Sequence, residues 1–131
     1  LGCARNAAYG GVMPRQHWLT TYLGGRHLTE ASNIVFSNGK LDPWARQGVL
    51  PVNGTSLRRT ATGLVSSDAG LGPGSVALLI DKAAHHLDLF FSHADDPASV
   101  VDARAIEMEH VAQWIAQKSE KVALRRANMD N

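Results

Sequence analysis

Residues 34–36 form a short run of apolar side chains, and an aspartate fixed in front of a proline follows closely. The run predicts a strand that is buried on both faces. The pair Asn38-Gly39 predicts the turn that ends the strand, because both residue types tolerate positive φ. Pro43 favours extended backbone geometry at Asp42. The sequence therefore predicts a carboxylate just beyond the carboxyl end of a buried strand, where open α/β sheets place their chemistry.

A second apolar run, from Ser75 to Asp81, predicts another strand, and His85 and His86 follow it. If the two strands are parallel neighbours, their carboxyl ends share one edge of the sheet, and Asp42 can hold one of the imidazoles. An imidazole moves protons near neutral pH, and a buried carboxylate orients it and stabilises the imidazolium. Acid before base is the chain order of the α/β-hydrolases, in which the nucleophile comes first. The 131 residues contain no G-x-S-x-G motif, so we expect the serine outside them.

The same residues allow two other interpretations. In the first, Asp42 caps a turn and His86 bonds to a carbonyl group in the core. In the second, the histidines and carboxylates near the end of the second strand bind a metal, since these side chains suit zinc and other divalent ions. The candidate ligands are His85, His86, Asp88, His93 and Asp81. Adjacent histidines in an extended segment point to opposite faces, so we predict no metal site and no cofactor.

The connection between the predicted strands, residues 45–74, contains six glycines and two prolines. It is long enough for the crossover that parallel strands require. We expect a Gly-rich surface loop there, with a helical turn at residues 47–50. Asn53-Gly54-Thr55 matches the glycosylation sequon, which is used only if the protein enters the secretory route.

Residues 96–118 predict a helix, with Asp96 as a good N-cap and Pro97 suited to the first helical position. Five apolar residues spaced by three and four predict the face that packs on the core. They are Val101, Ala105, Met108, Ala112 and Ile115, and Trp114 and Val111 widen this face. The polar tail from Glu120 to Asn131 is expected to fray. The order of strand, crossover, strand and helix is that of the end of a doubly wound α/β sheet.

Residues 1–30 give weaker signals. Residues 17–23 favour a short helix, and Cys3 is the one cysteine of the chain. Cys3 is either a buried free thiol or a half-cystine whose partner lies upstream. Because the chain starts with Leu, we interpret it as processed or as a fragment, so the missing signal peptide carries no information on location.

The composition is ordinary for a globular protein, with 44% hydrophobic residues and a net charge of +1. This charge points neither to a nucleic acid nor to an anionic membrane surface. No apolar run approaches the roughly 18 residues of a membrane span.

Three segments contain motifs that are more specific than spacing. They are NIVFSNGKLDPW at 33–44, AAHHLDL at 83–89 and SHADDPASVVDARAIEMEHVAQWI at 92–115. Together they resemble the carboxyl-terminal part of the serine exopeptidase family of lysosomal Pro-Xaa carboxypeptidase and dipeptidyl peptidase II. The resemblance implies that residues 31–131 are the C-terminal portion of an α/β-hydrolase fold, an α/β class. Residues 1–30 would be the end of an inserted helical region or a lead-in segment.

The resemblance assigns the catalytic acid to Asp42 and the base to His85, with His86 as a supporting residue. It implies a serine in a Gly-Gly-Ser-Tyr-Gly-Gly turn that these residues lack, so the fragment alone is expected to be inactive. Trp44 matches a tryptophan of the motif and is a candidate for the wall of the substrate pocket. The implied reaction is cleavage of peptides next to proline or a small residue. The segment 92–104 is more similar to the dipeptidyl peptidase II branch, with Pro-Xaa carboxypeptidase as the alternative.

The resemblance further implies a lysosomal, vesicular or secreted location, glycosylation at Asn53 and a disulfide partner for Cys3. Homodimers are implied for the dipeptidyl peptidase II branch. The expected partner is a peptide substrate. Two hypotheses of other classes stand beside this one: a truncated, non-catalytic product, and the metal-binding module.

Overall fold

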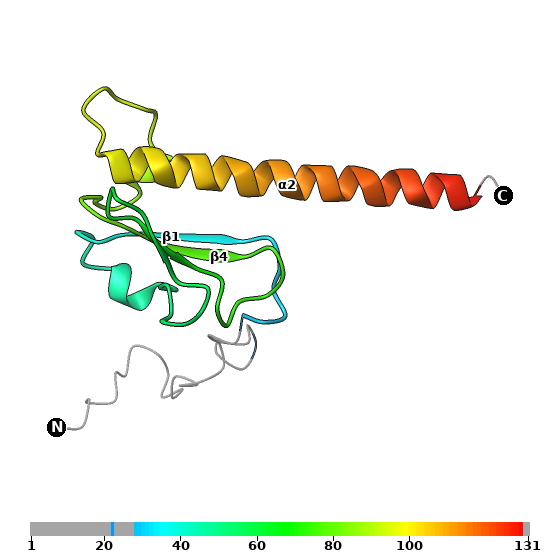
Figure 1. The fold of residues 1–131 in the computed structure, drawn as a ribbon, viewed down its shortest axis with the longest axis horizontal. Coiled ribbons are helices and arrows are strands. Elements are labelled where there is room, and N and C mark those ends of the chain that lie inside the picture. Colours follow the sequence, from blue (N-terminus) through cyan, green and yellow to red (C-terminus); the bar gives the residue numbers. More distant parts are fainter. Residues whose placement is uncertain (1–21, 23–27, 130–131) are drawn as a thin grey trace, which may run out of the picture.

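The computed structural model describes Tyr22 and residues 28–129. Cys3 and all of the predicted helix at residues 17–23 except Tyr22 lie outside the described residues. The described chain forms a four-stranded sheet with a long helix over one face (Figure 1). The two η elements are short 3₁₀ turns. The elements in chain order are β1 (Val35–Gly39), η2 (Ala45–Gln47), β2 (Arg58–Arg59), β3 (Val65–Ser67), β4 (Val76–Ile80), η3 (Leu87–Leu89) and α2 (Ala98–Met129).

The strands follow the order β1-β4-β3-β2 across the sheet. β1 and β4 are parallel, in a register that sets Val35 opposite Val76 and Gly39 opposite Ile80. The two strands that the sequence predicts are therefore parallel neighbours, and the loops after them leave the sheet at the same edge. β3 runs antiparallel to β4, and β2 runs antiparallel to β3.

The connection between β1 and β4 differs from the predicted surface loop, because it contains the hairpin β2–β3. The turn of this hairpin is closed by the amide of Thr60, which donates to the carbonyl oxygen of Leu64 at 2.9 Å. Gly63 in this turn has a φ of +93°, a conformation that favours glycine. The sequence does not show the hairpin because β2 has two residues, β3 has three, and β2 is exposed. The 3₁₀ turn at Ala45–Gln47 begins two residues earlier than the predicted one.

Asn38 and Gly39 are the last two residues of β1, whereas the sequence predicts a turn at this point. Neither residue has a positive φ. The turn follows at Lys40, whose amide donates to the carbonyl oxygen of Ile80 at 2.9 Å. Glycine is needed at position 39 for space, since a Cβ atom would lie 2.3 Å from the carbonyl oxygen of Ala84.

The core lies between the sheet and α2. Its buried members are Leu64, Val76, Leu78, Ile80, Ala83, Val100 and Ala103. β4 is buried apart from Leu79, because it has a neighbour on each side and α2 above it. β1 is half-buried up to Asn38, which corrects the prediction of a strand buried on both faces. Among the described strands β4 is its one neighbour.

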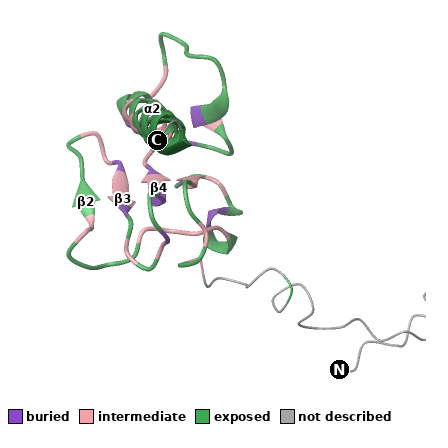
Figure 2. Ribbon diagram, turned by 90° about the vertical axis from the view of Figure 1, so that its right-hand side faces the viewer, coloured by how far each residue is buried: buried purple, intermediate pink, exposed green. Residues whose placement is uncertain are grey.

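α2 packs on the sheet through a different face from the predicted one. Val101, Met108 and Ile115 of the predicted stripe are 53%, 66% and 62% exposed. Val100 and Ala103 are buried instead. Figure 2, which shows α2 nearly end-on, displays exposed residues over most of the helix.

Contacts near the start of α2 select this face. The hydroxyl group of Ser99 donates to the carbonyl oxygen of Asp81, directly after β4. Farther along, the indole of Trp114 donates to the carbonyl oxygen of Gly74, two residues before β4, at 3.1 Å. Asp96 is not the helix cap that the sequence predicts, because its Oδ2 accepts from the amide of His93 and from Arg104.

The predicted fraying of the tail is also wrong, since α2 continues to Met129 and projects well past the sheet (Figure 1). No helix in residues 22 and 28–129 is both long and apolar enough to cross a membrane.

Candidate active site

Asp42 is held just beyond β1 by the backbone of its own loop. The amide of Leu41 donates to the carbonyl oxygen of Ala83 at 3.0 Å, and the amide of Asp42 donates to that of Gly39 at 3.0 Å. The first of these bonds ties the acid loop to the segment that leads into the histidines. The amide of Trp44 donates to Oδ1 of Asp42 at 2.9 Å. This bond fixes the rotation of the carboxylate and leaves Oδ2 for another donor.

Oδ2 of Asp42 lies 2.6 Å from Nδ1 of His85. The Asp42 side chain is 8% exposed, whereas that of His85 is 58% exposed. The hydrogen bond with His85, and next the amide of Trp44, hold the pKa of Asp42 below its usual 3.8. Asp42 is therefore an ionised acceptor at neutral and mildly acidic pH, and the proton of this bond lies on Nδ1.

The arrangement leaves Nε2 of His85 as the ring nitrogen that can accept a proton. With the proton on Nδ1, the neutral ring has its lone pair on Nε2 and can accept a proton there. The carboxylate behind the ring stabilises the imidazolium that results. The exposed ring can therefore exchange a proton with a group that binds in front of it.

His86 contacts the ring of His85 rather than the acid. Its backbone is left-handed, with φ 54° and ψ 29°. The two ring centroids are 3.9 Å apart, with the ring planes at 52°. A left-handed non-glycine residue costs on the order of 1 kcal/mol or more and persists where its surroundings hold it. The supporting role of His86 stays a prediction.

Of the other predicted site residues, Trp44 lies beside this pair, whereas His93 is held elsewhere. His93 is held in its own turn, where its amide donates to Asp96 and its ring accepts from the amide of Asp95. Across the described part of the chain, no group of three or more histidine, cysteine, aspartate or glutamate residues could hold a metal ion. Trp44 is 63% exposed beside the carboxylate loop, and Asn53 is exposed.

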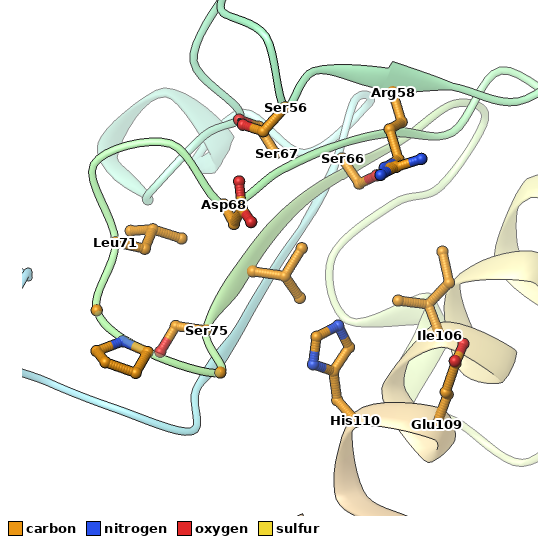
Figure 3. A pocket seen from close by; sticks show the side chains of 14 residues that line it. Ser56, Arg58, Ser66, Ser67, Asp68, Leu71, Ser75, Ile106, Glu109 and His110 are labelled. Atoms are coloured by element: carbon orange, nitrogen blue, oxygen red, sulfur yellow. The ribbon is translucent and has the colours of Figure 1, made fainter. Parts of the chain in front are cut away.

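A cavity of about 620 Å³ lies at the opposite end of β4 from His85. Ser75 and Val76 line it from the start of β4, and Ile106 and His110 line it from α2 (Figure 3). Since His85 follows the other end of the strand, this cavity is not the pocket of the acid–histidine pair.

Two charged residues of α2 face the histidine loop and were missed by the sequence analysis. Arg104 donates to the backbone of η3 and to Asp96. Burial, and next the carboxyl group of Asp88, raise the pKa of Glu107 to about 7. Positions 100, 103, 104 and 107 share one helical face, so the burial of Val100 turns Arg104 and Glu107 inward. No sequence pattern indicated that this face is the buried one.

The described chain is a mixed α/β protein with a carboxylate–imidazole pair at the ends of two parallel strands, an arrangement that hydrolases use. It belongs to the serine carboxypeptidase S28 family, whose model matches residues 5–107.

Relatives with known names agree with this assignment. Over 105 residues the chain is 42% identical to lysosomal Pro-X carboxypeptidase of Mus musculus and 41% identical to that of Homo sapiens. Each match covers 80% of this chain and 18% of the relative. Prolyl carboxy peptidase like protein 5 of Caenorhabditis elegans is 34% identical over 96 residues, which cover 73% of this chain and 16% of the relative. The chain thus spans less than one fifth of the length of these relatives.

Proposed function

We propose that the full-length polypeptide is a serine-type exopeptidase in which His85 is the general base and then the general acid. The main support is the 2.6 Å contact between Nδ1 of His85 and the carboxylate of Asp42. In this scheme Nε2 takes the proton of the serine hydroxyl while the serine oxygen attacks the peptide carbonyl. Nε2 then returns this proton to the leaving amine. Asp42 stays ionised and stabilises the imidazolium between the two steps.

The serine and the oxyanion hole are proposed to come from chain outside these 131 residues. In support, the match covers only 18% of the mammalian relatives. We assign residues 31–131 to the carboxyl-terminal part of an α/β-hydrolase domain, with residues 1–30 leading into it. Without nucleophile and oxyanion donors, the 131 residues alone are expected to show no peptidase activity.

For the substrate, we propose a peptide with proline or a small residue next to the cleaved bond. The names of the relatives favour release of the carboxyl-terminal residue, as in a Pro-X carboxypeptidase. The segment 92–104 favours the dipeptidyl peptidase II branch, which releases amino-terminal dipeptides. Peptides blocked at one end or the other separate these two activities, since each requires one free terminus.

A lysosomal location is proposed from the names of the mammalian relatives. Glycosylation of the exposed Asn53 would accompany passage through the secretory route. The exposed Trp44 beside the carboxylate loop is our candidate for a wall of the substrate pocket. A homodimer is proposed only together with the dipeptidyl peptidase II activity.

The test is His85→Ala in the full-length polypeptide, with a prolyl peptide as substrate. We expect kcat/KM to fall by about 10²-fold or more, because general acid–base catalysis contributes that much. A fluorophosphonate probe, which reacts with activated serines, should label the parent and not the variant. The control is His93→Ala, since the His93 side chain is 71% exposed and bonds within its own turn. Activity within about tenfold of the parent would remove His85 from the mechanism.

The competing hypothesis is a truncated, non-catalytic product. It predicts that the sequence upstream of Leu1 has no glycine-flanked serine after an apolar strand, and that the probe labels nothing.

A further inference from the structure

One side chain of α2, that of Arg104, makes three hydrogen bonds to the segment between His85 and α2. Arg104 donates from Nε to the carbonyl oxygen of Asp88 at 2.9 Å, and from Nη2 to that of Leu87 at 3.0 Å. Both carbonyl groups belong to η3, the 3₁₀ turn that starts two residues after His85. Two bonds from one rigid, planar group fix the orientation of this turn as well as its position.

The same guanidinium group holds the far end of the loop. Its Nη1 donates to Oδ2 of Asp96 at 2.6 Å, and this oxygen also accepts from the amide of His93 at 2.8 Å. The side chains of Arg104 and Asp96 are 19% and 8% exposed, so the pair is largely shielded from water. Residues 89–95 between these attachments are exposed. Arg104 therefore closes the histidine loop at both ends.

α2 gives Arg104 a fixed support. Val100 and Ala103 are fully buried in the core that β4 shares. The hydroxyl group of Ser99 bonds to the carbonyl oxygen of Asp81, the residue that follows β4. β4, which precedes the loop, and α2, which follows it, are thus joined close to the point from which Arg104 extends.

We propose that Arg104 is a positioning residue that holds the backbone under His85 so that its ring meets Asp42. The inference rests on the proposed function. The His85 ring is 58% exposed, so the core does not place it. Leu87 packs against the core and the side chain of Asp88 bonds to Glu107, but both are side-chain contacts that do not hold the backbone of the turn directly. The bonds from Arg104 to the two carbonyl groups of the turn do hold it.

A simpler role for Arg104 is to offset the negative charge of Asp88, Asp96 and Glu107. Lysine separates the two roles, because it keeps the charge but cannot reach three acceptors in one plane. A positioning role predicts that Arg104→Lys loses activity, and a charge role predicts that it does not.

The experiment measures kcat and KM for Arg104→Lys and Arg104→Ala in the full-length polypeptide. We expect kcat to fall by about 10- to 100-fold with KM within about twofold, since a shift of about 1 Å in a catalytic group can cost 100-fold. Added methylguanidinium should restore part of the kcat of Arg104→Ala. Asp96→Asn leaves both carbonyl bonds in place and should lose less. Arg125→Ala, an exposed arginine near the far end of α2, is the matched control.

Parent-like kcat in Arg104→Lys would overturn the proposal, as would a loss in Arg104→Ala that methylguanidinium does not relieve. If Arg104→Ala does not fold, the kcat of Arg104→Lys decides alone. His85→Ala separates the two levels of inference. An active His85→Ala variant overturns the proposed function itself, whereas an inactive one beside a fully active Arg104→Lys overturns only the role of Arg104.

Discussion

A Cβ atom on Gly39 would lie 2.3 Å from the carbonyl oxygen of Ala84 and 2.5 Å from that of Ala83. The end of β1 and the segment leading to His85 are therefore in direct backbone contact. No side chain fits between them. This contact, together with the bond from the Leu41 amide to Ala83, sets the distance between the two loops that carry the acid and the imidazole.

Gly39→Ala should therefore move the histidine loop away from Asp42. We expect kcat/KM to fall by about tenfold or more and the free energy of unfolding to fall by about 1–3 kcal/mol, as for overpacking elsewhere. Steady-state kinetics and thermal unfolding measure the two effects. Gly54→Ala is the control, because its nearest contact would be an ordinary 3.9 Å. Parent-like activity in Gly39→Ala would contradict the close approach.

Asp42→Asn tests the role of the carboxylate. An amide at this position can donate to Nδ1 and so favours the ring tautomer with its proton on Nε2, which cannot act as a base. We expect kcat to fall by about 10³- to 10⁴-fold with little change in KM. Asp95→Asn, at a side chain that is 92% exposed, should behave like the parent. Equal activity in the two variants would show that the pair at 2.6 Å is structural.

Glu107 should make the free energy of unfolding fall as pH rises through the weakly acidic range. Burial, and next Asp88, raise its pKa from 4.5 to about 7 in the folded state. Between these values the unfolded chain has released the proton and the folded chain retains it. The stability contributed by this group therefore falls as pH rises from 4.5 to about 7, and then levels off.

Glu107→Gln keeps the neutral form at every pH and should remove this decline. Thermal unfolding at about pH 5 and about pH 7.5 should show the variant gaining on the parent at the higher pH. Glu120→Gln, an exposed position on the same helix, should leave the dependence unchanged. A gain that is equal at both pH values would contradict the raised pKa.

The orientation of α2 can be tested with two adjacent valines. Val100 is fully buried and Val101 is 53% exposed. Val100→Ala should lower the free energy of unfolding by about 1–3 kcal/mol, and Val101→Ala should change it by less than about 0.5 kcal/mol. Denaturant unfolding of the full-length variants measures both. A larger loss of stability in Val101→Ala than in Val100→Ala would instead support the helix face that the apolar stripe predicts.

Asn53 should carry a glycan in protein from a secretory host. We expect endoglycosidase treatment to lower the mass, and Asn53→Gln to show no such change. An unchanged mass in the treated parent would exclude modification at this exposed sequon.

The parts of the structure that were predictable depend on short-range patterns. The runs at 34–36 and 75–81 lead to the strands Val35–Gly39 and Val76–Ile80, because each is a short, largely apolar segment bounded by turn residues, a pattern typical of strands. Asp42 and His85 were identifiable because each follows such a strand and lies within a specific motif. Parallel neighbouring strands placed Asp42 near His85 or His86, and the family resemblance selected His85.

The predictions that failed depend on contacts between distant segments. The face of α2 that meets the sheet carries Arg104 and Glu107 beside Val100, so the apolar periodicity identifies the helix but indicates the wrong face. The contacts of Ser99 and Trp114 with the ends of β4 decide which face packs. The hairpin β2–β3 is too short to show a pattern, and it forms because β4 offers an edge with which β3 pairs.

Local patterning in the chain thus encodes two strands, a long helix and the approach of Asp42 to a histidine pair, and motif resemblance identifies His85 as the partner. The tertiary structure alone decided the face of α2, the need for glycine at position 39 and the three bonds of Arg104. Such features arise from packing between residues far apart in the chain, where the free energy depends on geometry that no local pattern records.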